Sequence, residues 1–264
     1  MKHLLGIYTI WYRDVLRFWH DRMRLVGSIF TPLLFLFVFG SGLGASTRAA
    51  FQSSGLDYTQ FMYPGIIGMT VLMSSFMAGV SLVWDREFGF LKEVLVAPIS
   101  RVSVALGKTL GSATVALLQG IIILLFAPLI GFPLTLWKVL ALLPLMLLLS
   151  ASMGSLGILL ATRIRSMEAF QAIMQMLMFP MVFLSGVFFP MQGLPAWMNV
   201  LVKINPATYG IAPIRQVLLG TSTGSPFAIT VLGHTMTIWD NIMVTAIFGT
   251  VMLLLAMWSF ESQG

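Results

Sequence analysis

Long stretches with almost no charged residues alternate with short polar segments along this chain. A spanning helix needs about 20 mostly apolar residues, and six of the stretches reach that length. They predict transmembrane spans at residues 25–44, 60–84, 104–130, 138–162, 168–189 and 241–260. The apolar runs lack the polar alternation of membrane β-strands. The expected fold class is therefore all-α integral membrane, with six transmembrane helices in one domain at residues 25–264.

The segment before the first span, residues 1–24, predicts an amphipathic helix. At 100° per residue, Arg13 and Arg17 fall on one charged stripe, whereas Trp11 and Trp19 fall on the opposite, apolar face. This pattern is typical of an interfacial helix that lies in the plane of the membrane. Such a helix serves as a lipid anchor, and a docking surface for a cytoplasmic partner is the further interpretation.

Composition and charge agree with a membrane protein and give it an orientation. Apolar residues make up 58% of the 264 residues and charged residues only 9%, with a mean hydropathy of +0.94. Eleven of the fifteen Lys and Arg residues lie before the first span, between the second and third, or after the fourth, when Lys108 near the start of the third span is counted with the loop before it. The positive-inside rule then places both termini in the cytoplasm. Anionic lipids account for the net charge of +6, so no nucleic-acid partner is expected.

Nothing in the sequence predicts catalytic or metal chemistry on this chain. It has no cysteine, its three histidines are far apart, and the acidic residues near the spans lie at or beyond span ends. The fragments at residues 107–109 and 184–186 each match only part of a nucleotide-binding motif. We therefore expect no ATP site here. A secondary carrier and a membrane-embedded enzyme or assembly factor remain as alternatives to an ATP-driven permease.

A dense charge cluster, WDREFGFLKEVLVAPISR, separates the second and third spans. As a helix over residues 85–97, it has one charged face and one apolar face, with Glu87 isolated on the apolar face. The helix could rest on lipid headgroups, but a carboxylate on that face favours a protein groove that offers a donor. We expect Arg86 and Glu87 to make polar contacts with a partner, and Phe88 and Leu91 to anchor the helix. The full set of predicted contact residues is Asp85, Arg86, Glu87, Phe88, Gly89, Leu91, Lys92, Glu93, Pro98 and Arg101.

The apolar stretch at residues 190–219 is divided by proline and glycine into pieces too short to cross a bilayer. It predicts two short helices that dip into the outer leaflet and return, with a loop after them. The residues singled out in this re-entrant region are Pro195, Asn205, Pro206, Tyr209 and Arg215.

The charged segment, together with LPAWMNVLVKINPATYGIAPIRQVLLG, resembles the permease subunit of type 2 ABC exporters. That family includes daunorubicin-type drug exporters and exporters of Nod factors and polysaccharides, and the resemblance covers nearly the whole chain. It implies a homodimer in the bacterial cytoplasmic membrane and two copies of a separate ATP-binding cassette subunit that carries ATP and Mg. It also implies that Glu87, Gly89 and Arg101 belong to a coupling helix. The family's Asn-Pro pair and later Arg map onto Asn205, Pro206 and Arg215, where a structural role is favoured over substrate contact.

The residues of the predicted spans indicate what kind of molecule, here called the cargo, would be transported. Methionine and phenylalanine dominate, and the neutral polar candidates for substrate contact are Gln119, Gln171 and Gln175. Flexible methionine suits varied apolar ligands, although it is also common in simple packing. A hydrophobic or amphipathic cargo, drug-like or lipid, is expected to leave the cytoplasm, with a lipid-linked glycan or polysaccharide as the alternative.

Overall fold

The computed structural model is a bundle of long helices. It describes residues 2–51, 56–87, 101–164, 166–191, 194–220, 228–231 and 233–261. The long helices are α1 (Lys2–His20), α2 (Arg22–Phe51), α3 (Tyr58–Glu87), α5 (Arg101–Leu124), α6 (Leu136–Arg163), α7 (Met167–Phe183) and α10 (Ile238–Glu261). The shorter elements are η2 (Ala127–Ile130), α8 (Ala196–Ile204), α9 (Pro206–Leu219) and an antiparallel pair, β1 (Thr230–Val231) and β2 (His234–Thr235). The all-α fold class is confirmed.

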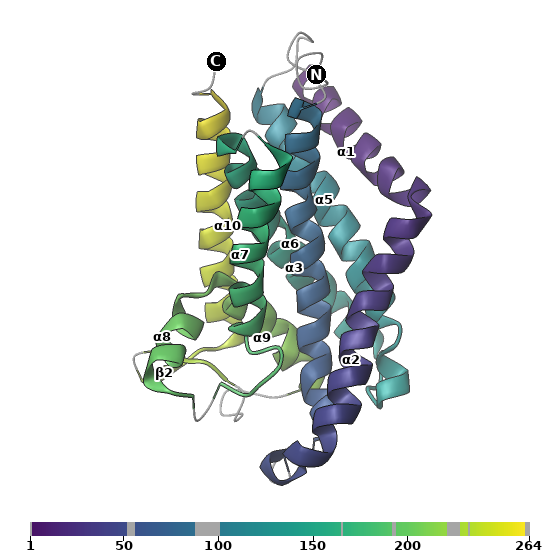
Figure 1. The fold of residues 1–264 in the computed structure, drawn as a ribbon, viewed down its shortest axis with the longest axis vertical. Helices are drawn as coiled ribbons and strands as arrows, with labels where there is room; N and C mark the ends of the chain where they lie inside the picture. Colours follow the sequence, from purple (N-terminus) through teal and green to yellow (C-terminus); the bar gives the residue numbers. More distant parts are fainter. Residues whose placement is uncertain are drawn as a thin grey trace.

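Both termini lie at the same end of the bundle (Figure 1). Helices α2, α3, α5, α6, α7 and α10 run along its long axis, and α8 lies with β2 near the opposite end (Figure 1). We call these the terminal end and the far end. Termini at one end agree with an even number of crossings. The assignment of the terminal end to the cytoplasm stays a prediction.

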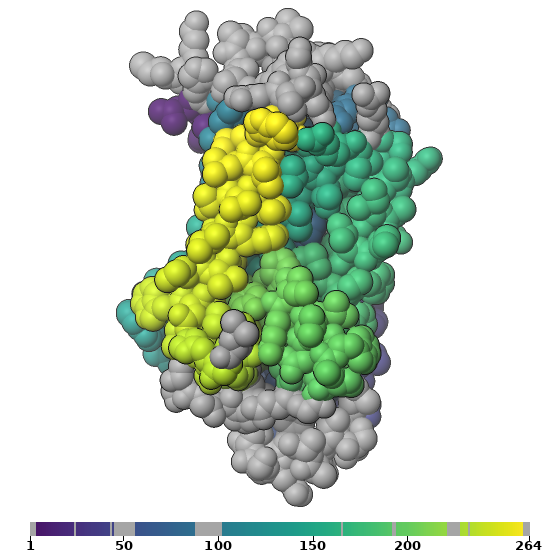
Figure 2. Space-filling view, turned by 90° about the vertical axis from the view of Figure 1, so that its left-hand side faces the viewer, coloured from purple at the N-terminus to yellow at the C-terminus, as the bar shows by residue number. Residues whose placement is uncertain are grey.

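Helix α3 forms the centre of the bundle. In the apolar 18-residue stretch of α3, 78% of the residues are buried, against 22% in that of α10 and 17% in that of α2. It packs against α6, α5, α2 and α9, and its large apolar side chains, such as Phe61, Tyr63 and Phe76, are fully enclosed. Figure 2 shows α10 on the surface of the molecule, where it runs toward the terminal end. Apolar residues on that exposed surface suit contact with lipid rather than with water.

The length of the helices supports membrane crossing for most of the predicted spans. Within the described residues, α2, α3, α5, α6 and α10 contain apolar stretches of 18 residues or more. Helix α7 is apolar but has 17 residues. The count of six crossings therefore stays a prediction.

Several helices end at other residues than the sequence predicts. Helix α7 ends at Phe183 rather than at residue 189, and the nearby Gly186 has a φ of 76°, which a helix cannot accommodate. Helix α5 ends at Leu124, and the short η2 with Pro128 replaces the rest of the span expected up to residue 130. Proline lacks the N–H that a continuing helix needs. Helix α1 ends at His20, and α2 begins at Arg22.

Glycine allows two of the central helices to approach each other closely. A Cβ on Gly79 of α3 would collide with the backbone oxygen of Gly157 on α6 and with the ring of Phe170 on α7. A second close approach lies beneath α1, where a Cβ on Gly107 or Gly111 of α5 would meet Ile10 or Asp14. Small residues permit this kind of packing between membrane helices.

Candidate functional site

Four charged side chains form a cluster near the terminal end. The Nζ of Lys108 lies 2.7 Å from a carboxylate oxygen of Asp85 and 3.3 Å from one of Asp14. A guanidinium nitrogen of Arg13 lies 2.8 Å from Asp85 and 3.4 Å from Asp14. We call Arg13, Asp14, Asp85 and Lys108 the charge cluster. Its two positive and two negative charges cancel, and the cluster ties α1 to α3 and α5.

The charge cluster corrects two expectations from the sequence. Lys108 is not a solvated cytoplasmic cation, since its side chain is only 2% exposed inside the bundle. Asp85 does not lie on an open face for a partner, because it is buried against Lys108 and Arg13. The reason is that α3 continues to Glu87, so Asp85 still faces the neighbouring helices. Lys108 also donates to the hydroxyl of Ser81 at 2.6 Å.

Arg86 and Glu87 end α3 in contrasting surroundings. Arg86 donates to the backbone oxygens of Ala161, Thr162 and Ile164 at 3.2 to 3.3 Å. These carbonyls belong to the C-terminal end of α6, where oxygens lack partners within the helix. Arg86 therefore joins α3 to α6 rather than extending toward a partner, which corrects its expected role. Glu87 is exposed.

Most of the predicted coupling helix lies outside the described residues. The positions concerned are Phe88, Gly89, Leu91, Lys92, Glu93 and Pro98. Arg101 begins α5, but its side chain is also outside the described part of the chain. Their contacts with a partner stay predictions.

Helix α1 packs along α5, and its predicted position in the plane of the membrane stays a prediction. The indole nitrogen of Trp11 donates to Thr114 of α5 at 2.9 Å, and Phe18 is buried. The guanidinium of Arg17 lies 5.7 Å from the centre of the Trp84 ring on α3. Trp19 is exposed on the outer side. Of the two tryptophans on the predicted apolar face, Trp19 thus points outward and Trp11 contacts α5, while the charged stripe with Arg13 and Arg17 faces the bundle.

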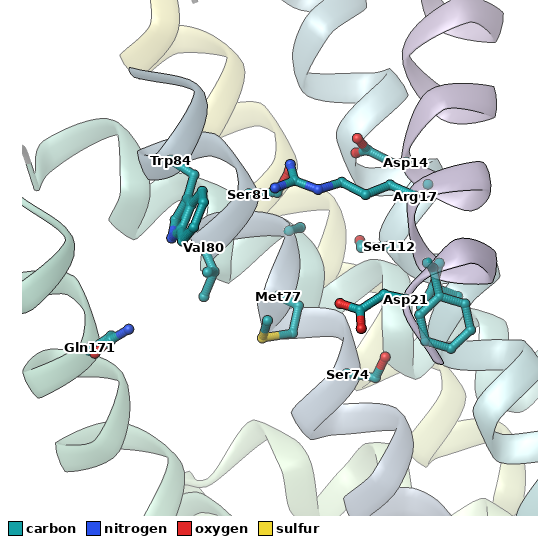
Figure 3. Close-up of a pocket in the computed structure, with 14 residues that line it drawn as sticks. Asp14, Arg17, Asp21, Ser74, Met77, Val80, Ser81, Trp84, Ser112 and Gln171 are labelled. Atoms are coloured by element: carbon teal, nitrogen blue, oxygen red, sulfur yellow. The ribbon is translucent and has the colours of Figure 1, made fainter. Parts of the chain in front are cut away.

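A partly open cavity of about 340 Å³ lies between α1, α3, α5 and α7. Figure 3 shows Arg17 reaching from α1 toward Ser81 and Trp84 of α3, with Asp21 near Ser74 below. We call this the headward cavity. Its walls carry both charged and apolar side chains, namely Asp14, Arg17, Phe18, Asp21, Ser74, Met77, Ala78, Val80, Ser81, Trp84, Gly111, Ser112, Val115 and Gln171.

A second, smaller hollow of about 150 Å³ lies farther along α3 and α7. We call it the methionine groove. Its lining is almost wholly apolar and consists of Phe35, Met69, Met73, Met174, Gln175, Met178, Phe179, Val182, Phe183 and Phe188. The structure separates the three glutamines expected at a substrate site. Gln171 lines the headward cavity, Gln175 lines the methionine groove, and Gln119 is buried inside the bundle.

The predicted re-entrant region forms two short helices that meet at Asn205. The side chain of Asn205 accepts from the N–H of Ala207 and donates to the backbone oxygen of Met181 at 2.8 Å. Pro206 follows at the first position of α9, where a missing N–H costs nothing. Tyr209 donates to the backbone oxygen of Lys203. Asparagine here caps a helix and fixes the turn.

Two further residues of this region hold it in place. Arg215 is buried, donates to the backbone oxygen of Gly186 and lies 4.6 Å from the centre of the Phe61 ring. Pro195 precedes α8 as its N-cap. Arg215 and Pro195 thus have structural roles within the chain. The predicted dip of this region into the outer leaflet stays a prediction.

The sequence analysis did not single out Asp14, and it did not predict that Lys108 is buried. One signal was present: Gly107 and Gly111 flank Lys108 with the spacing that brings another helix close. A lysine beside such a contact lies at the edge of the buried face, and a buried ammonium needs a carboxylate. Which carboxylates meet it depends on the pairing of α1, α3 and α5, which the sequence does not specify.

Comparison with known proteins agrees with this architecture. A family model described as "ABC-2 type transporter" matches residues 6–219, most of the chain. The chain belongs to this family. It is therefore a membrane permease subunit of an ABC transporter, and the resemblance noted in the sequence is confirmed. Membership also implies an ATP-binding partner for this ABC-2 permease.

Of three relatives of this chain, two are named as transport permeases. The putative transport permease ycf38 of Cyanophora paradoxa is 34% identical over 73% of this chain and 67% of its own length. The inner membrane transport permease YadH of Escherichia coli K12 is 28% identical over 83% of this chain and 86% of its own. Nodulation protein J of Rhizobium leguminosarum is 26% identical over 80% of this ABC-2 permease and 82% of its own length.

Proposed function

We propose that this chain is half of an ATP-driven exporter that moves a hydrophobic or amphipathic molecule, drug-like or lipid, out of the cytoplasm. The observation that carries the proposal is that two hollows follow one another along α3 and α7. The headward cavity presents charges near the terminal end, and the methionine groove presents apolar side chains beyond it. An amphipathic molecule meets both kinds of surface along this path.

The exposed side of the methionine groove supports a second copy of the chain as the other wall. Met73 is partly exposed on α3, and Phe179 and Phe183 are exposed on α7. A pathway for cargo through a membrane must be shielded from lipid, so two such faces would enclose it between them. Two ATP-binding subunits, which bind ATP and Mg, would dock on the cytoplasmic side of the two permease copies at the predicted coupling helix.

Motion of the docking subunits would reach the pathway through rigid elements. Glu87 ends the same helix that carries Met69 and Met73, and Arg86 and the charge cluster fasten that end of α3 to α6, α5 and α1. A helix of 30 residues is about 45 Å long at 1.5 Å per residue, which is enough to carry a displacement across the bilayer. The permease thus supplies the path, and its partner supplies the energy.

The proposal is tested in proteoliposomes that contain the permease and its ATP-binding partner. Transport and stimulation of ATP hydrolysis are measured with a panel of hydrophobic cations and with lipid-linked sugars. We expect the hydrophobic compounds to be transported. Stimulation by lipid-linked sugars alone would contradict the cargo assignment, and transport driven by an ion gradient without ATP would contradict the exporter itself.

Filling the methionine groove tests its place in the path. Met73→Trp should lower transport of a bulky hydrophobic cargo about tenfold, because the groove of about 150 Å³ has little room for a larger side chain. ATP hydrolysis without cargo should be unchanged. Met243→Trp, on the exposed face of α10, is the matched control. Equal loss in both variants, or none in Met73→Trp, would contradict this pathway.

A further inference from the structure

The headward cavity contains a buried hydroxyl group that the fold leaves unused. Ser74 is only 6% exposed, and its oxygen has no hydrogen-bond partner among the described residues. A buried hydroxyl is normally paired with protein or with a ligand. Ser74 lies on the wall of the cavity near Asp21 (Figure 3). The cavity therefore holds a position at which a polar atom of a ligand would be stabilised.

Arg17 offers hydrogen-bond donors to the same cavity. Its guanidinium lies over the Trp84 ring, 5.7 Å from the ring centre, and within the described part of the chain it forms no ion pair with a carboxylate. A guanidinium has five N–H donors in a planar fork that fits the oxygens of a phosphate. The cation–π contact with the indole of Trp84 places this fork at the cavity wall.

The carboxylates on the wall make a simple anion a poor fit. Asp14 is bound by Lys108 and Arg13, so its charge is compensated within the charge cluster. Asp21 adds a further carboxylate to the cavity. A carboxylate accepts several hydrogen bonds, so Asp21 can receive an ammonium group in addition to its contacts within the chain. Both signs of charge thus face the ligand.

An apolar wall continues from these charged groups. Met77, Val80 and Trp84 of α3 line the cavity, and Trp84 is partly exposed. Exposed tryptophan near the end of a membrane helix is typical of the headgroup level of a bilayer. The volume of about 340 Å³ is in the range of small-molecule sites. The cavity has room for a headgroup and the start of an apolar chain.

We propose that the headward cavity binds the zwitterionic headgroup of an amino-phospholipid. The phosphodiester lies at Arg17, the ammonium group at Asp21, and an ester or phosphate oxygen accepts from Ser74. The apolar wall takes the first part of the lipid chains. Binding requires neither nucleotide nor the ATP-binding partner, so this inference stands or falls separately from the proposed transport activity.

Native mass spectrometry of the purified full chain in detergent tests the proposal. The probes are short-chain phosphatidylethanolamine, phosphatidylglycerol of the same chain length, and soluble glycerophosphoethanolamine. Phosphatidylethanolamine should be retained several-fold more than phosphatidylglycerol, which has no ammonium group for Asp21. Displacement of the lipid should need far more glycerophosphoethanolamine than competing lipid, because the soluble headgroup gains nothing from the apolar wall.

Variants identify the residues responsible. Arg17→Gln should lower phosphatidylethanolamine retention about tenfold, since it removes a charge-assisted contact to phosphate. Asp21→Asn should abolish the preference over phosphatidylglycerol. Arg163→Gln is the matched control, because Arg163 is also exposed and lies 5.9 Å from the Trp258 ring, with no place in the cavity. Circular dichroism and size-exclusion chromatography verify that each variant is folded.

Several results would overturn the proposal. Equal retention of phosphatidylglycerol would show that only negative charge is recognised. An equal effect of Arg17→Gln and Arg163→Gln would show that lipid binds at the surface without this cavity. Equal displacement by glycerophosphoethanolamine and by lipid would show that the ligand is a soluble molecule.

Discussion

Lys108 is the residue on which the terminal end of the bundle depends most. Its ammonium group is enclosed and lies between two carboxylates from different helices. Burying such a group is costly unless charged and polar partners surround it, and here Asp14, Asp85 and Ser81 all contact it. Without this ammonium, the two carboxylates would share Arg13 as their one cation among the described residues.

Replacing the lysine should therefore destabilise the protein strongly. Lys108→Met should lower the free energy of unfolding by about 3–5 kcal/mol, because it leaves buried charge without compensation. Unfolding in mixed micelles with increasing denaturing detergent measures the change. Lys203→Met, at a partly exposed lysine of α8 outside the cluster, should change it by less than about 1 kcal/mol. Similar losses in both variants would contradict a special role for Lys108.

The limit of sequence reasoning at this scale is pairing between distant residues. Counting lysines and arginines placed Lys108 with solvated charges, because the count ignores which helices are neighbours. Asp14 and Asp85 are 71 positions apart in the chain, and only packing of α1 and α3 against α5 brings them to one ammonium group. Asn205 was more predictable, since an Asn-Pro pair at a helix start is a local signal.

At the scale of elements, the contact between α3 and α6 holds the centre of the bundle together. Gly79 and Gly157 let the two backbones come close, and Arg86 adds hydrogen bonds to the end of α6. The contact is formed by backbone atoms, which cannot move aside as a flexible side chain can. Helix α3 therefore has a fixed position relative to α6.

A methyl group at this contact should force the helices apart. Gly79→Ala should cost about 1–3 kcal/mol of stability through overpacking, although alanine favours a helix by about 1 kcal/mol. The detergent unfolding assay measures it. Gly27→Ala in α2 is the control, since no described atom beyond its own turn of helix lies within 4 Å of the added Cβ, and it should be neutral or stabilising. An equally neutral Gly79→Ala would show that the contact can relax.

The positions of the helices were far more predictable than their ends. Length and hydropathy located the long helices because the bilayer requires apolar segments of a given length. The early end of α7 at Phe183 was not predicted, because an apolar turn such as the one at Gly186 resembles a span in hydropathy. Hydropathy shows only that a segment could cross the membrane. It does not show a backbone conformation, such as that of Gly186, that ends a helix.

At the scale of the whole molecule, one helix joins the predicted contact with the ATP-binding partner to the proposed path for cargo. Helix α3 carries the exposed Glu87 at the terminal end, the wall of the headward cavity next, and the methionine groove beyond. The charge cluster and Arg86 make neighbouring helices follow its movement. A displacement at Glu87 would thus shift both hollows together.

The most direct test of this account is cargo-stimulated ATP hydrolysis by the permease co-expressed with its ATP-binding partner. Glu87→Ala should abolish the stimulation while leaving folding and membrane insertion intact, because we expect the carboxylate to meet a donor in the partner. Glu168→Ala removes another exposed carboxylate, in the first turn of α7, and should leave stimulation unchanged. Undiminished stimulation in Glu87→Ala, or a permease that never binds the partner, would contradict the account.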